Sequence, residues 1–172
     1  TVSFLPTHWE NQAYYFTTST TNEYFLLENK IQDGFDSGLP GQGMLIYHVD
    51  QDYIDNHFSS NDINASSHLG LKIMDAGNNG SIDDDDCPFP GSSVNTVFTD
   101  ASSPSSLSWS GNPTNKPITN ISTVNVVCIA FDFMGGSGCV PPPAQCKNLS
   151  ATSITDTSIS LQWTRGAMCD QN

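Results

Sequence analysis

Short apolar runs separated by long polar loops limit the folds open to this chain. No apolar pattern with a helical period of about 3.6 residues extends beyond about two turns. Strand-like runs recur instead, at Glu23–Asn29, Gly43–Val49, Leu69–Asp75 and Val127–Phe133. The last run places an apolar side chain at every second position. The sequence therefore predicts an all-β fold, an antiparallel β-sandwich of jelly-roll-like type with long loops.

Two segments within these runs lack polar alternation, Tyr24–Leu27 and Leu45–Tyr47. Strands that are buried on both faces have continuous apolar runs of this kind. We therefore predict that both segments lie in central strands of one sheet, with both faces covered, packed against Val127–Phe133. On this interpretation Leu26→Ala should cost about 2–5 kcal/mol of stability.

The composition changes abruptly after Met134. The stretch "MGGSGCVPPPAQC" combines flexible glycines with a stiff triple proline, which is typical of a linker. Beyond it, Ile159, Leu161 and Trp163 alternate with polar residues, the pattern of a half-buried strand. The sequence therefore predicts a β-sandwich domain, a linker and a short C-terminal segment, at 1–134, 135–147 and 148–172.

The C-terminal segment "NLSATSITDTSISLQW" resembles the first two strands of a fibronectin type III domain, whose second strand carries a tryptophan such as Trp163. Two strands cannot close a sandwich of about seven strands. We therefore expect residues 148–172 to be an incomplete fibronectin-like segment. It would dock on the first domain or be stabilised by something outside this sequence.

The charge balance excludes several classes of partner. The formal net charge is −13, with 18 acidic and five basic residues. Binding to nucleic acid or to an anionic membrane surface needs clustered lysine and arginine, so neither is expected. No stretch approaches the ~20 apolar residues of a membrane helix, and membrane insertion is not expected. Calcium and other hard cations are the partners that such a surface attracts.

The cysteine pattern indicates an oxidising compartment. None of the five cysteines forms a CxxC pair or a zinc-finger spacing. Their spread is typical of a secreted protein with one or two disulfide bonds, although some could be small buried apolar residues. We predict a disulfide bond either between Cys139 and Cys146 or between Cys87 and Cys128.

An acidic stretch, "DAGNNGSIDDDD", follows one of the predicted strands and places oxygen donors at several ligand positions of an EF-hand calcium loop. Gly77 lacks an oxygen where that loop has a ligand, and the "CPFPG" that follows cannot begin a helix. A calcium loop on a β scaffold, a solvated acidic turn and a catalytic cluster are the alternatives. We predict a structural calcium site with the ligands Asp75, Asn79, Ser81, Asp83 and Asp86.

The sequence contains no familiar catalytic motif. The histidines do not form HExxH, and neither a GxSxG elbow nor a phosphate-binding glycine loop occurs. Glu23 and Glu28 stand an odd number of positions apart on one strand, so they should face opposite sides and form a poor acid–base pair. His48 and Asp50 share a strand face on which a hydrogen bond could form. We expect His48 to be structural rather than a general base.

The order of several blocks resembles a known arrangement. The blocks are "EYFLLENKIQDGFDSGLPGQGMLIYHVD", "HLGLKIMDAGNN", "DDCPFPG", "ITNIS" and "FDF". Together they resemble the region after the catalytic domain in secreted zinc metallopeptidases of the immune inhibitor A family, over residues 1–134. The sequence departs from the family pattern at Lys30–Ile31, Leu69 and Asp86–Cys87. The family's HExxH helix lies upstream of this region, so the resemblance implies zinc only in a catalytic domain that this sequence lacks.

The resemblance implies a non-catalytic C-terminal segment of a secreted zinc metallopeptidase. Such a segment supports the peptidase unit or binds a substrate or a surface. The implied parent protein is a peptidase, but this chain is expected to be inactive alone. Its expected partner is the upstream catalytic domain of the same polypeptide, and a protein or glycan substrate is a further candidate.

Two other functions remain open. A free-standing module that binds glycan or protein would expose aromatic rings for stacking. The candidates for such rings are Trp9, Tyr53 and Trp109. A hydrolase with paired aspartates would need two carboxyl groups about 5–9 Å apart, such as those of Asp50 and either Asp83 or Asp86.

Overall fold

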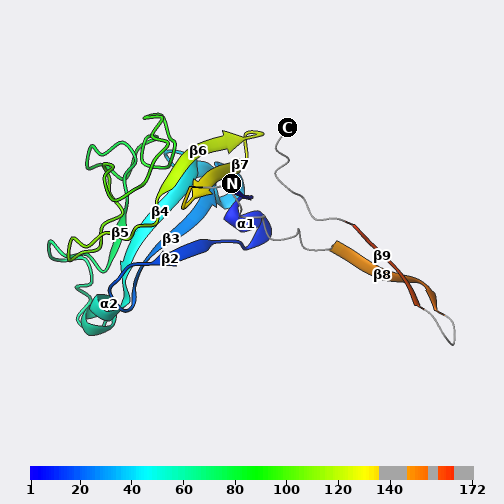
Figure 1. Ribbon diagram of the computed structural model, residues 1–172, viewed down its shortest axis with the longest axis horizontal. Helices are drawn as coiled ribbons and strands as arrows, with labels where there is room; N and C mark the ends of the chain where they lie inside the picture. The colour runs from blue at the N-terminus through cyan, green and yellow to red at the C-terminus, as the bar shows by residue number, and fades with distance from the viewer. Residues whose placement is uncertain (136–146, 155–158, 165–172) are drawn as a thin grey trace.

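Two antiparallel sheets form the body of the protein (Figure 1). The computed structural model describes residues 1–135, 147–154 and 159–164. One sheet has the strand order β1-β7-β6, with the bounds Val2–Phe4, Cys128–Phe133 and Ile118–Val124. The other has the order β2-β3-β4-β5, with the bounds Tyr14–Thr17, Glu23–Lys30, Gly43–Asp50 and Leu71–Ile73. The predicted all-β, sandwich-like fold is confirmed.

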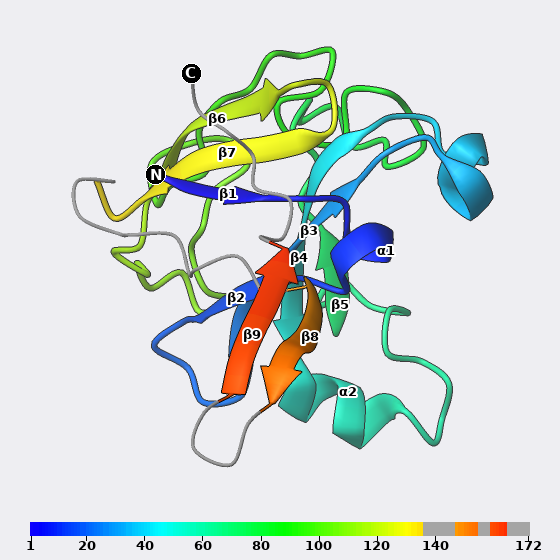
Figure 2. The same cartoon turned by 90° about the vertical axis from the view of Figure 1, so that its right-hand side faces the viewer.

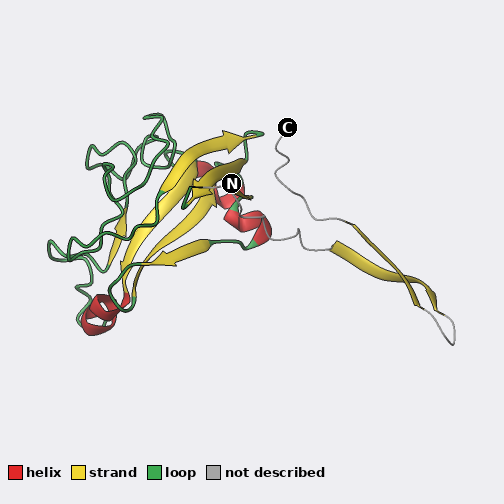
Figure 3. Ribbon diagram, in the orientation of Figure 1, coloured by secondary structure: helices red, strands yellow, loops and turns green. Residues whose placement is uncertain are grey.

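The helices of the described residues are short and lie between strands (Figure 3). They are α1 (Thr7–Glu10), the 3-10 helix η1 (Gly34–Gly38) and α2 (Gln51–His57). The helix α2 begins directly after β4 because the Asp50 carboxylate accepts a hydrogen bond from the N–H of Tyr53 at 2.9 Å, as an N-cap does. None of these helices has the length and apolar character needed to span a membrane.

The main hydrophobic core lies between the two sheets. Phe25 and Leu27 of β3 and Ile46 of β4 face Ile129 and Phe131 of β7, and all five are at most 3% exposed. Figure 2 shows β1, β7 and β6 side by side as one layer of this sandwich. The predicted central position of the Tyr24–Leu27 and Leu45–Tyr47 segments is confirmed, since β3 and β4 are the inner strands of their sheet.

The prediction that both faces of these strands are covered is wrong. Along β3, buried residues alternate with half-buried ones. Leu27 faces the core and is 1% exposed, whereas Leu26 is half-buried on the opposite face. The large loss of stability predicted for Leu26→Ala is therefore expected for Leu27→Ala instead, because the burial of a side chain sets the cost of truncating it.

The cysteine prediction is corrected in part. Cys87 is a free thiol in the described structure and is only 2% exposed, and burial raises the pKa of this thiol to about 11. Cys128 is disulfide-bonded. The prediction of a disulfide bond between these two cysteines is therefore wrong. Cys87 lies beside Ala76, while Cys128 packs with Leu5 in a separate cluster. The alternative pair, Cys139 and Cys146, lies outside the described residues.

A two-stranded antiparallel sheet follows the sandwich in sequence. Its strands are β8 (Lys147–Ile154) and β9 (Ile159–Thr164), which begin at the last residue of the predicted linker and otherwise lie in the predicted fibronectin-like segment. Most of the predicted linker and the end of the chain lie outside the described residues.

Candidate functional site

The predicted calcium loop begins shortly after β5 ends. The Asp75 carboxylate accepts hydrogen bonds from the N–H groups of Gly77, Asn79 and Gly80 at 2.8–2.9 Å. A Cβ atom at Gly77 would meet the Asp86 carboxylate, so a larger residue here would have to displace that side chain. Asp75 therefore shapes the turn from within, as an aspartate in an Asx turn does.

The Asn79 side chain lies at the centre of the acidic loop. Its amide NH2 donates to Asp84 at 3.2 Å and to Asp86 at 3.1 and 3.2 Å, and its Oδ1 accepts the N–H of Ser81 at 2.7 Å. The hydrogen bond between the two carboxyl groups raises the pKa of Asp86 and lowers that of Asp84. The amide and these two carboxyl groups thus form one compact polar cluster.

The five predicted ligands do not gather around one point. Asp75 uses its carboxylate within the turn, Asn79 offers N–H groups rather than oxygen to the carboxylates, and Asp83 is exposed. Among the described residues no group of three or more His, Cys, Asp or Glu is arranged to hold a metal. The carboxyl groups that do meet belong to Asp86 and Asp84, and sequence analysis had not included Asp84. Calcium binding stays a prediction.

The Asp86→Asn variant separates the alternatives for this loop. In EDTA at pH 7 we expect this change to raise the midpoint of thermal unfolding, because folding raises the pKa of Asp86 and its ionised form is destabilising above that pKa. Millimolar calcium should raise the midpoint of the wild-type chain by mass action but not that of the variant. Scanning fluorimetry measures both effects.

Asp83→Asn tests a second predicted ligand, since Asp83 is exposed. This variant should keep the wild-type midpoint in EDTA and lose part of the rise that calcium causes. Equal wild-type midpoints in calcium and in EDTA would leave the solvated acidic turn as the interpretation of the loop.

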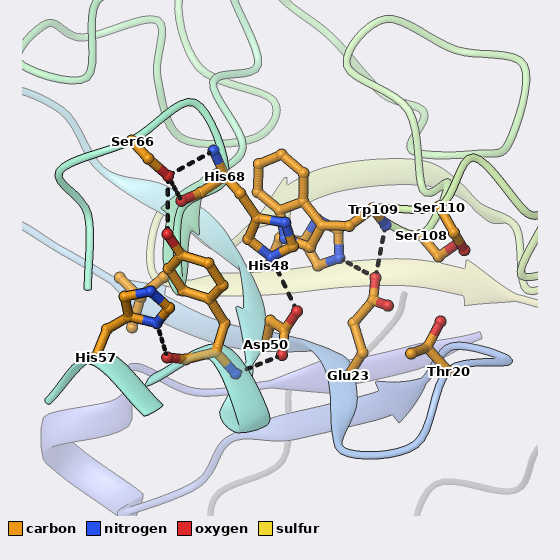
Figure 4. Close-up of polar contacts among 12 residues, drawn as sticks. Thr20, Glu23, His48, Asp50, His57, Ser66, His68, Ser108, Trp109 and Ser110 are labelled. Carbon is orange, nitrogen blue, oxygen red and sulfur yellow. Dashed lines mark hydrogen bonds and ion pairs between the residues drawn. The ribbon is translucent and has the colours of Figure 1, made fainter. Parts of the chain in front are cut away.

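A column of stacked rings occupies the opposite end of β4 (Figure 4). Neighbouring ring centroids are 3.9–5.3 Å apart, and neighbouring planes lie within 25° of each other. The rings follow one another in the order Phe25, His48, Trp109, His68, Tyr53 and His57. The column joins the sheet, α2 and two long loops.

Glu23 is the buried anchor of this ring column. Its Oε1 lies 2.6 Å from Nε2 of His48 and accepts the N–H of Trp109 at 2.8 Å. Glu23 is 1% exposed and His48 is 4% exposed. Burial lowers the pKa of His48, and the hydrogen bond and charge of Glu23 offset only part of this effect. His48 is thus a buried imidazole whose partner is Glu23 rather than Asp50.

Asp50 is the second carboxylate of the column. Its Oδ2 lies 2.9 Å from Nε2 of His68, and its Oδ1 caps α2 through the N–H of Tyr53. The Ser66 hydroxyl bonds to the main chain of His68 and to the Tyr53 hydroxyl. The serine does not contact the His68 ring, so these residues do not form a Ser-His-Asp triad.

The structure does not bring together the paired aspartates of the hydrolase hypothesis. Phe89, shortly after Asp86, pairs with Met44 at the start of β4, whereas Asp50 ends that strand. At about 3.3 Å per residue, the distance from Met44 to Asp50 is about 20 Å. Asp50 is therefore too far from Asp83 or Asp86 for paired-carboxylate catalysis, which needs about 5–9 Å.

The rings proposed for glycan stacking are mostly occupied by other rings. Trp109 lies between His48 and His68, and Tyr53 lies between His68 and His57. Trp9 is 47% exposed and contacts only the edge of a ring, that of its neighbour His8, among the ring pairs of the described residues. Of the candidates, Trp9 alone therefore keeps an open ring face.

Asp100 organises the long segment that carries Trp109. Its carboxylate accepts the hydroxyl of Ser106 at 2.8 Å, the N–H and hydroxyl of Thr114 at 2.9 Å, and the N–H of Asn115 at 2.8 Å. Partial burial opposes ionisation of Asp100, but these hydrogen bonds outweigh it and hold its pKa below the ordinary value.

Asp100→Asn is expected to lower the free energy of unfolding at pH 7 by about 1–3 kcal/mol, since a neutral amide replaces a charged acceptor of several hydrogen bonds. A lowered carboxyl pKa contributes stability above the ordinary value of 3.8, and this contribution is lost as the pH falls through the lower folded-state pKa. The difference between wild type and variant should therefore shrink below pH 3.8. Urea unfolding at several pH values measures it, and a difference independent of pH would contradict this role.

Sequence reasoning missed the ring column because its members are far apart in the chain. Periodicity within β3 and β4 places Glu23, His48 and Asp50 on one face, but it does not show which loop covers them. Trp109 was noticed only as a possible exposed ring in a polar loop. The local signal for its burial is weak, since "SSLSWSGN" has few apolar residues.

Comparison of the chain with models of protein families, with curated proteins and with solved structures finds no match.

Proposed function

We propose that this chain is a non-catalytic β-sandwich segment of a secreted zinc metallopeptidase of the immune inhibitor A type, and that it packs against the catalytic unit upstream in the same polypeptide. The observation that supports this most is an apolar sheet face outside the core. The proposal draws also on the resemblance of the sequence blocks that form this sheet.

The outer face of the sheet β2-β3-β4-β5 is rich in large apolar side chains. One row across the strands consists of Tyr15, Leu26, Tyr47 and Ile73. The next row consists of Thr17, Tyr24, Val49 and Leu71. Tyr15 is 70% exposed and Leu71 is 38% exposed, whereas Val49 is only 4% exposed. None of these residues belongs to the core cluster between the sheets.

The charges at one end of this outer face pair with each other. The Lys30 ammonium lies 3.9 Å from Glu28 and 3.2 Å from Asp36, and the Tyr47 hydroxyl donates to Glu28 at 2.6 Å. A solvated face of an antiparallel sheet is usually polar, whereas tyrosine and apolar residues are enriched where proteins meet. This face therefore fits a contact with another domain.

The blocks behind the resemblance supply three of the four strands in these rows. "EYFLLEN" lies in β3, "GMLIYHVD" forms β4 and "LKI" of the second block forms β5. The carboxylates and imidazoles near them are engaged in buried or capping contacts, which is a structural use. We therefore assign this sheet to docking on the peptidase unit rather than to catalysis.

The test begins with the coding frame upstream of Thr1, where an HExxH motif is expected. The longer polypeptide that contains it should show slower amide exchange at Tyr24, Leu26 and Tyr47 than the present chain. Leu26→Asp should lower the free energy of unfolding of the longer protein much more than that of the present chain. Thr123→Asp, on an exposed position of β6, should affect both equally. A longer protein without HExxH, or with unchanged exchange at this face, would refute the proposal.

A free-standing module that binds glycan or protein is the alternative. Trp9 favours it, because this ring is 47% exposed. A glycan array probed with the wild-type chain and with Trp9→Ala tests it, and binding that depends on Trp9 would support the alternative.

A further inference from the structure

A compact turn carries Trp109 at its tip. Within it the N–H of Ser108 donates to the carbonyl of Asn112 at 3.0 Å, and the N–H of Gly111 donates to the carbonyl of Ser108 at 2.8 Å. The N–H of Asn112 also donates to the Ser108 hydroxyl at 3.0 Å. These bonds close the turn on itself, so it keeps its shape whether or not it touches the sheet.

Trp109 fastens this turn to the sheet. Its N–H donates to Glu23 of β3, its ring stacks on His48 of β4, and the Lys72 ammonium of β5 lies 5.7 Å from the ring centroid. The opposite side of the ring stacks on His68 at 4.4 Å. Through its main-chain N–H and its ring, Trp109 thus connects the turn to three strands.

His48 is shielded from water by this same ring. Phe25 stacks on His48 at 4.2 Å and is itself fully buried in the core. Trp109 stacks on His48 at 5.3 Å and is itself half-buried, so it separates the imidazole from the surface. An imidazolium is strongly hydrated, and burying a charge without water costs free energy. Movement of Trp109 is the change that would hydrate a protonated His48.

Charged groups face His48 from each strand of this end of the sheet. Glu23 on β3 and Asp50 on β4 favour its protonation, while Lys72 on β5 opposes it. The turn from Leu107 to Asn112 carries no charged side chain. The burial of the imidazole opposes protonation more strongly than its neighbours favour it, so the closed arrangement prefers neutral His48.

We propose that Trp109 and His48 form an acid-released clasp, in which protonation of His48 frees the Trp109 turn from the sheet and opens this end of the sandwich. The clasp does not depend on the function proposed above. Because the closed form lowers the pKa of His48 and an open form leaves it near its ordinary value of 6.5, the closed form is stable above pH 6.5. Below this pH the ratio of open to closed molecules rises by up to about ten-fold per pH unit, until the pH reaches the lowered pKa.

The test uses Trp109 as its own reporter. The chain has three tryptophans, so a Trp9→Phe/Trp163→Phe variant leaves Trp109 as the only one. Acrylamide quenching of its fluorescence should be weak at pH 8 and several-fold stronger at pH 5. Far-UV circular dichroism at each pH shows that the sheets persist. Quenching that stays weak to pH 5 in a folded protein would overturn the proposal.

Two substitutions assign the transition to one histidine. His48→Gln keeps an N–H donor for Glu23 but does not titrate, and its quenching should not change with pH. His68→Gln removes the ring on the other side of Trp109 and should leave the transition in place. The same transition in His48→Gln would overturn the proposal.

A measurement on the wild-type chain covers the case in which His48→Gln fails to fold. The protection factor of the Trp109 N–H, which is bonded to Glu23, should fall between pH 7 and pH 5, by up to about ten-fold per pH unit below pH 6.5. The protection factor of the Ile129 N–H in the core should stay constant. Equal behaviour of the two N–H groups would contradict the clasp.

Discussion

Leu27→Ala is expected to lower the free energy of unfolding by about 2–5 kcal/mol, whereas Leu26→Ala should cost about 1 kcal/mol or less. The two leucines are neighbours on β3 and the substitutions remove the same atoms. Leu27 is 1% exposed among the core residues of both sheets, and its loss leaves a cavity that close-packed neighbours fill only in part. Leu26 stands on the outer face, where water or neighbouring side chains replace the lost atoms.

Urea unfolding followed by circular dichroism measures this difference, with the slope of the transition compared between variants to show that the unfolded states are alike. Equal costs for the two variants of the present chain would mean that the outer face is covered within this chain. In the longer polypeptide of the proposed function, the cost of Leu26→Ala should rise towards that of Leu27→Ala. The pair therefore reports both on the core and on the docking face.

The strand pattern could be predicted from the sequence because it depends on neighbouring residues. β3, β4 and β7 match the predicted apolar runs to within one residue at each end, and both inner strands were recognised from their continuous apolar character. The same pattern led to the wrong prediction that both faces of these strands are covered. Continuous apolar character is shared by strands buried within one domain and by strands whose outer face meets another domain, and the sequence of one strand does not distinguish them.

The candidate sites were harder to predict because they depend on contacts across the chain. In the acidic loop, the carboxyl group beside Asp86 belongs to Asp84 and not to the predicted ligand Asp83. The turn around Asp75 fixes which side chains point inward. In the ring column, the partner of His48 is Glu23 on the neighbouring strand, a choice set by strand register. The match of the acidic stretch to a calcium loop used sequence spacing alone. Spacing shows neither which side chains point into a turn nor which residues strand register brings together.

Glu23→Ala is expected to be among the most destabilising single changes outside the apolar core, at about 2–6 kcal/mol, since each unpaired buried donor costs about 1–3 kcal/mol. It leaves two donors, the His48 ring and the Trp109 N–H, without an acceptor at a buried site. Glu28→Ala is the matched control on the same strand. Glu28 is half-buried on the outer face, where it accepts the Tyr47 hydroxyl at 2.6 Å, and water replaces that bond after truncation, so the expected cost is about 1 kcal/mol.

A double-mutant cycle between Glu23→Ala and His48→Ala shows whether the loss arises from their contact. The double variant should cost clearly less than the sum of the single variants, because the second substitution removes a group that the first has already left unpaired. Trp109 fluorescence should shift to longer wavelength in Glu23→Ala as the turn loses its anchor, and Glu28→Ala should leave it unchanged. Additive costs together with an unshifted Trp109 spectrum would mean that Glu23 fixes neither His48 nor the turn, and that the ring column is held by stacking alone.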